Sequence, residues 1–269
     1  MRNGRAEWAP DTLRRVLAER RLADLATVIG VEPAGSLELG GKLLIEPDGA
    51  VVGTLGEPDL DRLVIADAPE VLADRKSRVK VYELQQGERV LRARVFHESL
   101  EPQPQLLVVG AGHIAVPLAH FGKMLGFEVV VVDDREKYAS RERFPDADTV
   151  IAADFGETLR DFPITPATYV VIITRAHTYD EESLRILLHQ PWAYLGMIGS
   201  RRRVQTVLRT MVGEGYDRER LDQIRAPIGL DVGAETPEEI ALAIVSEVVA
   251  ARRGGTGQSL SKMQRPIAA

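Results

Sequence analysis

The chain has 269 residues, of which 45% are hydrophobic and 28% charged, and these are the proportions of a soluble globular protein with about two domains. Its formal net charge of −6 argues against a nucleic-acid partner, which would require a basic surface. The absence of cysteine excludes disulfides, thiolate metal sites and a cysteine nucleophile.

Two further signals concern the location of the protein. No apolar run approaches the roughly 18 to 20 residues that a membrane span needs. The N-terminal stretch "MRNGRAEWAP" lacks the apolar centre of a signal peptide. We therefore expect a cytoplasmic protein with no membrane span.

Residues 1–100 are predicted to form a small α+β domain. Apolar residues recur with helical spacing in 11–21, and 59–75 also has a helical pattern. Strand patterns flank Pro47-Asp48-Gly49, which has the chemistry of a hairpin turn. Two later strands alternate with period two around a turn at Gln86-Gly87.

Residues 101–105 are predicted to be a linker, because two prolines and two glutamines separate an alternating strand from a continuous apolar one. At the other end of the chain, residues 254–269 are rich in glycine and serine and have no periodicity. This segment is expected to be a flexible tail or to pack on a partner.

Residues 106–253 show continuous apolar strands separated by helical segments, which predicts a doubly wound, Rossmann-like parallel sheet covered on both faces. The expected strands are "QLLVVG", "EVVVVD", "DTVIAA", "TYVVIIT" and "AYLGMIG". The clearest helices are expected at 114–125, 180–190 and 202–211. A last helix should begin with Thr236 as N-cap, Pro237 in its first turn and Glu239 completing a capping box.

The stretch "LLVVGAGHIAVPLAHFGKMLGFEVVVVDD" has the form of a dinucleotide-binding loop. Gly110 would allow a tight turn after the first strand, and Gly112 would let the backbone approach a pyrophosphate. Asp133 ends the next strand, where a carboxylate can accept hydrogen bonds from a ribose. The predicted ligand contacts here are Gly110, Gly112, His113, Ile114, Asp133 and Asp134.

His113 has two interpretations that the sequence leaves open. Its imidazole could bind an anion or act as a proton donor, or it could point into solvent. The other histidines outside the predicted site, His97, His120 and His189, are expected to be structural or on the surface.

Polar residues follow two more of the predicted strands. In "TRAHTYD", the predicted contacts are Thr174, Arg175 and His177. Asp180 belongs to the same polar cluster, and the alternative for it is that it N-caps the following helix. In "IGSRRR", Gly199, Ser200 and Arg201 could hold an anion at the start of a helix. The alternative for this last segment is a solvated basic turn. No metal-binding pattern is present.

The residues also resemble a known family. The segments "GAGHIA", "VVDDRE", "FPDAD", "TRAH", "YLGMIGSRRR" and "APIGLDVGAETPEEIA" resemble the C-terminal domain of the XdhC/CoxI family, over about 106–253. "LATVIGVEPAGS" and "GGKLLIEPDGAVVGTLG" resemble the first domain of that family less closely. Its members are accessory proteins of xanthine dehydrogenase and related molybdenum hydroxylases.

The resemblance implies a molybdenum-cofactor chaperone, not itself chiefly a catalyst. Such a protein would bind the molybdopterin cofactor, protect it while a cysteine desulfurase partner supplies sulfur, and deliver it to an apo-enzyme of xanthine dehydrogenase type. An apolar first domain and the edge of a parallel sheet favour a homodimer.

The chain departs from the family pattern at two places. Gly56-Glu57-Pro58-Asp59 stands where the family usually has a glycine-rich turn with a cysteine. "TRAH" replaces the more usual Thr-His-Asp-His pattern. Two alternatives therefore remain: an NAD(P)-dependent oxidoreductase that uses Asp133 for the ribose and His113 or His177 as acid/base, or a nucleotide-sensing regulatory module.

Overall fold

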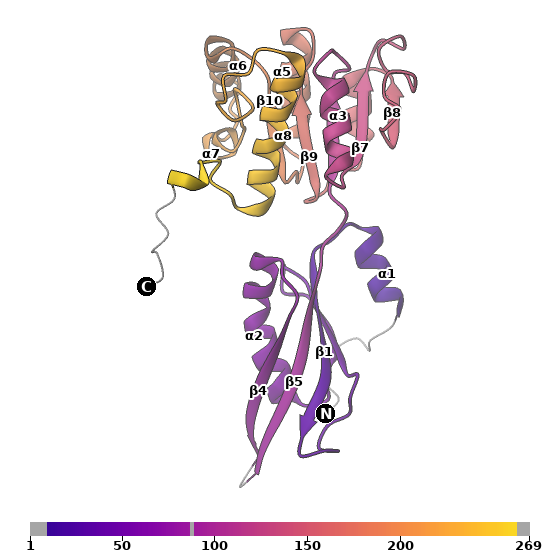
Figure 1. Cartoon of the computed structure of the whole chain (residues 1–269), viewed down its shortest axis with the longest axis vertical. Coiled ribbons are helices and arrows are strands. Elements are labelled where there is room, and N and C mark those ends of the chain that lie inside the picture. The colour runs from indigo at the N-terminus through magenta and orange to yellow at the C-terminus, as the bar shows by residue number, and fades with distance from the viewer. Residues whose placement is uncertain (1–9, 87–88, 263–269) are drawn as a thin grey trace. The chain divides into compact units, whose positions relative to one another are not determined.

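The computed structural model describes residues 10–86 and 89–262, and the chain divides into two compact units, Met1–Pro102 and Gln103–Ala269 (Figure 1). Each unit has its own five-stranded sheet. The division falls inside the predicted linker, and the last residue of that linker, Gln105, already begins the first strand of the second unit.

The first unit is an antiparallel sheet with a long helix packed along one face and a shorter helix against the other, and the predicted α+β fold is confirmed. Its sheet order is β3-β2-β1-β5-β4. Leu60, Val64 and Ala68 of the long helix α2 pack against buried residues of the sheet. The elements are α1 (Pro10–Ala18), β1 (Ala23–Glu32), β2 (Lys42–Ile45), β3 (Val51–Thr54), α2 (Pro58–Asp74), β4 (Arg78–Gln86) and β5 (Arg89–Leu100). Gly87 of the predicted turn lies outside the described residues.

The segment that departs from the family's cysteine-containing turn forms the start of α2. Gly56 has a φ of +95°, a conformation that favours glycine. Glu57 is the N-cap and Pro58 the first helical residue, where the missing N–H of proline costs nothing. Asp61 is buried and accepts hydrogen bonds from the Leu55 amide and the Thr54 hydroxyl, both at 2.8 Å. In this chain the turn is thus fixed by the N-cap of α2 and by the hydrogen bonds to Asp61.

A polar network lies inside the core of the first unit. Asp24 of β1 and His97 of β5 are both fully buried, and Oδ2 of the aspartate lies 2.7 Å from Nδ1 of the histidine. Nε2 of His97 lies 2.8 Å from the Tyr82 hydroxyl. Burial raises the pKa of the Tyr82 phenol. The structure therefore gives His97 the structural place expected for it, whereas His120 and His189 are exposed.

The second unit is a doubly wound parallel sheet, as predicted. Its strand order is β10-β9-β6-β7-β8, and every paired neighbour is parallel. The order of the strands along the chain reverses between β6 and β9, and this switch point is where ligands bind in such sheets. The strands are β6 (Gln105–Val109), β7 (Glu128–Asp133), β8 (Thr149–Ala152), β9 (Thr168–Ile172) and β10 (Tyr194–Met197).

Helices cover both faces of this sheet, and Figure 1 shows α3 and α8 side by side on one of them. Alternate residues of β6 enter the two cores, Leu106 and Val108 on the α3 side and Leu107 and Val109 on the other. This two-sided burial explains the continuous apolar pattern of the strands. The helices are α3 (Ala115–Met124), α4 (Phe155–Asp161), α5 (His177–Leu187), α6 (Arg201–Gly213), α7 (Arg218–Asp222) and α8 (Pro237–Arg253).

The ends of the helices confirm one capping prediction and correct another. The capping box of Thr236 and Glu239 is present at the start of α8. The prediction that Asp180 is an N-cap is wrong, because α5 begins at His177 and Ala176 holds the cap position. Asp180 instead lies inside the helix, fully buried.

The last described residues follow α8. Gly254 ends that helix in the left-handed conformation, and a short 3-10 helix, η1, covers Leu260–Lys262. Residues 263–269 of the predicted tail lie outside the described residues.

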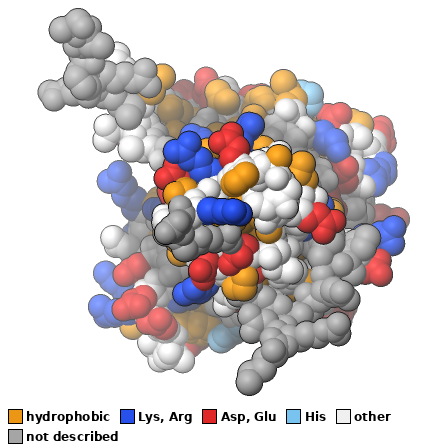
Figure 2. Space-filling view, turned by 90° about the horizontal axis from the view of Figure 1, so that it is seen from below, with side chains coloured by type: hydrophobic (Ala, Val, Ile, Leu, Met, Phe, Trp, Pro, Cys, Tyr) orange, Lys and Arg blue, Asp and Glu red, His pale blue; other side chains and the backbone are white. Residues whose placement is uncertain are grey.

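Among the described helices none is both long and apolar enough to cross a membrane. On the face drawn in Figure 2, acidic and basic side chains are interspersed, so neither sign dominates that view.

Candidate functional site

The predicted site residues follow the carboxyl ends of four adjacent strands, β10, β9, β6 and β7. Neighbouring strands lie about 4.8 Å apart, so the four strand ends span roughly 15 Å of one sheet edge. The fold therefore brings these segments, which are separated along the chain, to one edge. We call this edge the crevice and define it by residues 110–114, 133–135, 174–177 and 199–201.

The two glycines of the loop after β6 have different surroundings. Gly110 has a φ of +109°, and a Cβ there would lie 2.6 Å from the carbonyl oxygen of Ile173, so only glycine fits against β9. A Cβ at Gly112 would meet no atom within 4 Å. The loop thus leaves open space at Gly112, beside the exposed His113, while Ile114 packs against the core under α3.

Asp133 holds this loop to the end of β7. Its carboxylate is 1% exposed, and Oδ2 accepts a hydrogen bond of 2.7 Å from the Ala111 amide. Arg135 donates to Oδ1 through Nε at 2.8 Å and to Oδ2 through Nη2 at 3.0 Å, and its backbone N–H donates to Oδ1 at 3.1 Å. Both oxygens of the predicted ribose acceptor are therefore occupied by donors of the chain itself.

Two arginines that both contact the Tyr138 ring also reinforce the loop, and they were not predicted from the sequence. The Cζ atoms of Arg135 and Arg143 lie 3.6 Å and 5.0 Å from the centre of the Tyr138 ring. Arg143 also donates to the carbonyl oxygen of Ala111 at 2.7 Å. Arg135 could have been noticed, since it follows a strand-end carboxylate by two residues. Arg143 is 32 residues from Ala111, and no local pattern connects them.

Asp134 and Arg175 form an ion pair between the loops after β7 and β9. Two guanidinium nitrogens of Arg175 donate to the two carboxylate oxygens, with 2.7 Å between Nη2 and Oδ2. The Tyr179 hydroxyl accepts from the same Nη2 at 3.0 Å and lies 3.3 Å from Oδ2 of the aspartate. Hydrogen bonding from Arg175 lowers the pKa of Asp134 to about 2, and Asp134 in turn raises the pKa of Arg175.

A second set of contacts ties the loop after β9 to α6. The Thr174 hydroxyl donates to Asp180, and Nη2 of Arg203 pairs with the other oxygen of the same carboxylate. Thr174 and Asp180 are buried, and burial lowers the pKa of Arg203. The buried Asp180 therefore has a tertiary partner from each side, which explains why it does not cap a helix.

At the start of α6, Ser200 is the N-cap and accepts a hydrogen bond from the Arg203 amide at 3.3 Å. A Cβ at the preceding Gly199 would lie 3.3 Å from Cδ of Arg203. Three of the predicted contacts are exposed and have no partner side chain among the described residues: His113, His177 and Arg201. These side chains and the open backbone at Gly112 are the groups that a ligand could reach.

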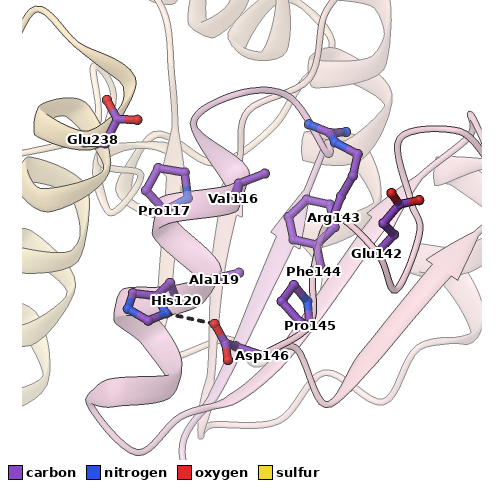
Figure 3. Close-up of a pocket in the computed structure, with 10 residues that line it drawn as sticks. All are labelled: Val116, Pro117, Ala119, His120, Glu142, Arg143, Phe144, Pro145, Asp146 and Glu238. Carbon is purple, nitrogen blue, oxygen red and sulfur yellow. Dashed lines mark hydrogen bonds and ion pairs between the residues drawn. The ribbon is translucent and has the colours of Figure 1, made fainter.

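A separate cavity of about 410 Å³ lies outside the crevice, between α3 and the loop before β8 (Figure 3). Val116, Pro117 and Pro145 are among the apolar residues that line it, and the His120 ring pairs with Asp146 at 2.8 Å. None of the predicted site residues lines this cavity. Among the described residues, no group of three or more His, Cys, Asp or Glu could hold a metal ion.

Comparisons with known proteins extend over both units. The XdhC Rossmann domain matches residues 106–248, and the XdhC and CoxI family matches residues 16–83. An Escherichia coli protein, YqeB, described as uncharacterized, is 32% identical over 233 residues, which cover 84% of this chain and 43% of YqeB. A Bacillus subtilis protein described as a probable xanthine dehydrogenase subunit is 33% identical over 159 residues, covering 59% of this chain and 46% of that protein.

The chain thus spans less than half the length of these two relatives. A crystal structure described as a xanthine dehydrogenase from Bacillus halodurans matches with a TM-score of 0.51 and 24% identity. That match covers 93% of this chain and 97% of the other, and it supports the fold alone.

Proposed function

Since the chain belongs to the XdhC and CoxI family, we propose that it is a cytoplasmic accessory protein of a molybdenum hydroxylase of xanthine dehydrogenase type. In this proposal the crevice binds the molybdopterin cofactor, and the protein delivers it to the apo-enzyme. The role is one of binding and transfer, with no chemical step assigned to the chain itself.

The observation that carries the proposal is the chemistry of the accessible groups in the crevice. Gly112 leaves its backbone open, and the exposed side chains of His113, His177 and Arg201 are imidazoles and a guanidinium. These groups donate hydrogen bonds to anions, and the start of α6 adds the positive end of a helix dipole. A bulky ligand that carries a phosphate suits this set of donors.

The hydrogen bonds and the burial of Asp133 argue against the alternative that the protein is an NAD(P)-dependent oxidoreductase. A dinucleotide of this kind needs a carboxylate that accepts hydrogen bonds from the ribose hydroxyls. Both oxygens of Asp133 already accept bonds from Ala111 and Arg135, and the residue is almost fully buried. Binding a ribose there would require the loop after β6 to lose its anchor.

The residues present fit molybdopterin in part. Its phosphate matches the amide and guanidinium donors of the crevice. The chain has no cysteine, so it offers no thiolate to the molybdenum, whose dithiolene sulfurs belong to the pterin itself. The crevice residues would therefore hold the pterin and its phosphate.

The partners follow from this role and are part of the proposal. While the cofactor is bound, a cysteine desulfurase would supply sulfur to it, and the apo-hydroxylase would then receive it. We further propose a homodimer, because the edge strand β4 carries Val79 and Val81 with half or more of each side chain exposed. Light scattering of the purified chain would measure its mass in solution.

A binding experiment tests the proposal. The purified full chain is titrated with molybdopterin released from a molybdenum enzyme, and, in parallel, with NADH and NADPH. Binding of the pterin, together with faster activation of an apo-hydroxylase by the loaded chain, is the expected result. Oxidation of NADH or NADPH with a carbonyl substrate, without any affinity for the pterin, would overturn it.

A further inference from the structure

The ion pair between Asp134 and Arg175 crosses the end of the central strand. Asp134 directly follows β7 and Arg175 lies three residues beyond the end of β9, while β6 lies between these two strands in the sheet. The contact therefore spans the carboxyl end of β6, from which the loop of Gly110 and Gly112 emerges. In parallel sheets of this type, that is the place where a bound phosphate group lies.

Asp134 occupies Arg175 in the way that a phosphate would. The two guanidinium nitrogens meet the two carboxylate oxygens in a bidentate arrangement, which is also how arginine binds phosphate. The hydrogen bonds with Tyr179 fix the same geometry from the α5 side. Arg175, the arginine of the loop after β9, is thus already paired with a carboxylate of the chain itself.

Two arginines at this edge differ in how easily they could change partners. Arg135 is bound to Asp133, which is 1% exposed and also holds the Ala111 amide, so losing Arg135 would leave a buried carboxylate without its nearest guanidinium. Asp134 and Arg175 have side chains that are 22% and 37% exposed. If the ion pair opens, water can solvate both groups, so only Arg175 is free to exchange.

We propose that the Asp134–Arg175 ion pair is an autoinhibitory strap over the crevice, which a ligand bearing a terminal phosphate group opens by taking Arg175 from Asp134. The inference rests on the proposed function for its site and adds how that site is controlled. A phosphate carries a larger charge than a carboxylate and has three terminal oxygens, so it competes for the same guanidinium. A neutral ligand has no such advantage.

The strap depends on one of the two places where the sequence departs from the family pattern. Arginine is found here where the resemblance leads one to expect histidine, in "TRAH". Its guanidinium is always charged and long enough to reach Asp134 across β6. Competition between the internal carboxylate and the ligand phosphate is therefore present at every physiological pH.

The test uses inorganic pyrophosphate as the probe and calorimetric titration of the full chain. In Asp134→Asn the strap loses its charge, and binding should tighten about three- to fivefold, the range that corresponds to an exposed ion pair. Glu136→Gln is the matched control. It removes the same charge from the same loop, and Glu136 is exposed with no partner in the described structure. This control should change affinity by less than half as much.

The role of Arg175 is tested by combining substitutions. Arg175→Gln should weaken pyrophosphate binding, and Asp134→Asn should give no gain in that background. A nitrogen NMR signal from Nε of Arg175 should shift when wild-type protein is saturated with pyrophosphate. Equal effects of Asp134→Asn and Glu136→Gln, or a gain that persists without Arg175, would overturn the strap.

The outcome is separable from that of the proposed function. A strap that responds to pyrophosphate in a chain without affinity for molybdopterin would sink the proposed function and leave the strap intact. Molybdopterin binding that Asp134→Asn does not alter, together with an unaltered pyrophosphate affinity, would sink the strap alone.

Discussion

The first unit and the second unit hold carboxylates in different surroundings, although both pair them with basic side chains. In the first unit, Asp24 and His97 are sealed together in the core, with no exposed surface on either side chain. In the second, Asp133 and Asp134 sit at a strand end, and their arginine partners keep about a third of their surface exposed. The enclosed pair therefore offers no surface to a ligand, whereas Asp134 and Arg175 keep exposed surface that a ligand can reach.

The largest effect on stability is expected at the enclosed pair. Asp24→Ala leaves Nδ1 of His97 without its carboxylate partner in the core, and breaking a buried pair in this way costs about 3 kcal/mol or more. Hydrogen exchange of the β1 and β5 amides reports the free energy of opening the first unit. Asp11→Ala, on the exposed face of α1, serves as the control and should cost less than about 0.5 kcal/mol. Similar losses in both variants would show that the network contributes no special stability.

A smaller loss is expected at Asp133, where one partner remains partly solvated. Asp133→Ala leaves the Ala111 amide and the Arg135 guanidinium without their acceptor, at a cost of about 2 kcal/mol. Chemical denaturation followed through the buried Trp192 measures it in the second unit. Because the loop after β6 would lose its anchor, binding of both pterin and dinucleotide should suffer. A variant that lost only NADH binding would restore the ribose role for this residue.

The exposed pair should contribute least to stability, and in a pH-dependent way. At neutral pH, Asp134→Asn should cost about 1 kcal/mol or less, as is usual for a pair open to solvent. The pKa of Asp134 is lowered to about 2 in the folded chain, from its ordinary value of 3.8. Its contribution is therefore complete above pH 4 and disappears as the pH falls towards 2. The difference in Tm between wild type and variant should vanish over that interval, and a constant difference would contradict the pairing.

Much of the fold follows from local patterns that the sequence displays directly. The five apolar strands of the second unit and the capping box of Thr236 depend on residues near one another in the chain, and the structure confirms them. The wrong N-cap at Asp180 had a different origin. That residue has the right side chain for a cap, but Thr174 and Arg203 from other elements hold it inside the helix. Tertiary contacts overrode the local preference.

The candidate site likewise has one feature that the sequence predicts and another that it does not. Its location at one sheet edge was predictable, because the carboxyl ends of parallel strands lie together. The binding partner of each side chain was not predictable, because the partners of Arg143 and Arg175 lie 32 and 41 residues away in the chain. A sequence can therefore indicate which residues reach the crevice, but not which of them are already bound to one another.

Arg201 provides the sharpest contrast, because it should matter for binding and hardly at all for stability. It is exposed in the first turn of α6 and has no partner among the described residues. Arg201→Ala should change the free energy of unfolding by less than about 0.5 kcal/mol. It should nevertheless weaken molybdopterin binding by about 1.5 to 3 kcal/mol, if the guanidinium makes a charge-assisted contact with the phosphate. Arg202→Ala removes an equal charge from the next position, so equal losses would mean that only the general field of this helix end attracts the ligand. A loss confined to Arg201→Ala would instead identify a direct contact. Both variants remove the same charge, so only a contact made by the Arg201 side chain itself could separate their effects.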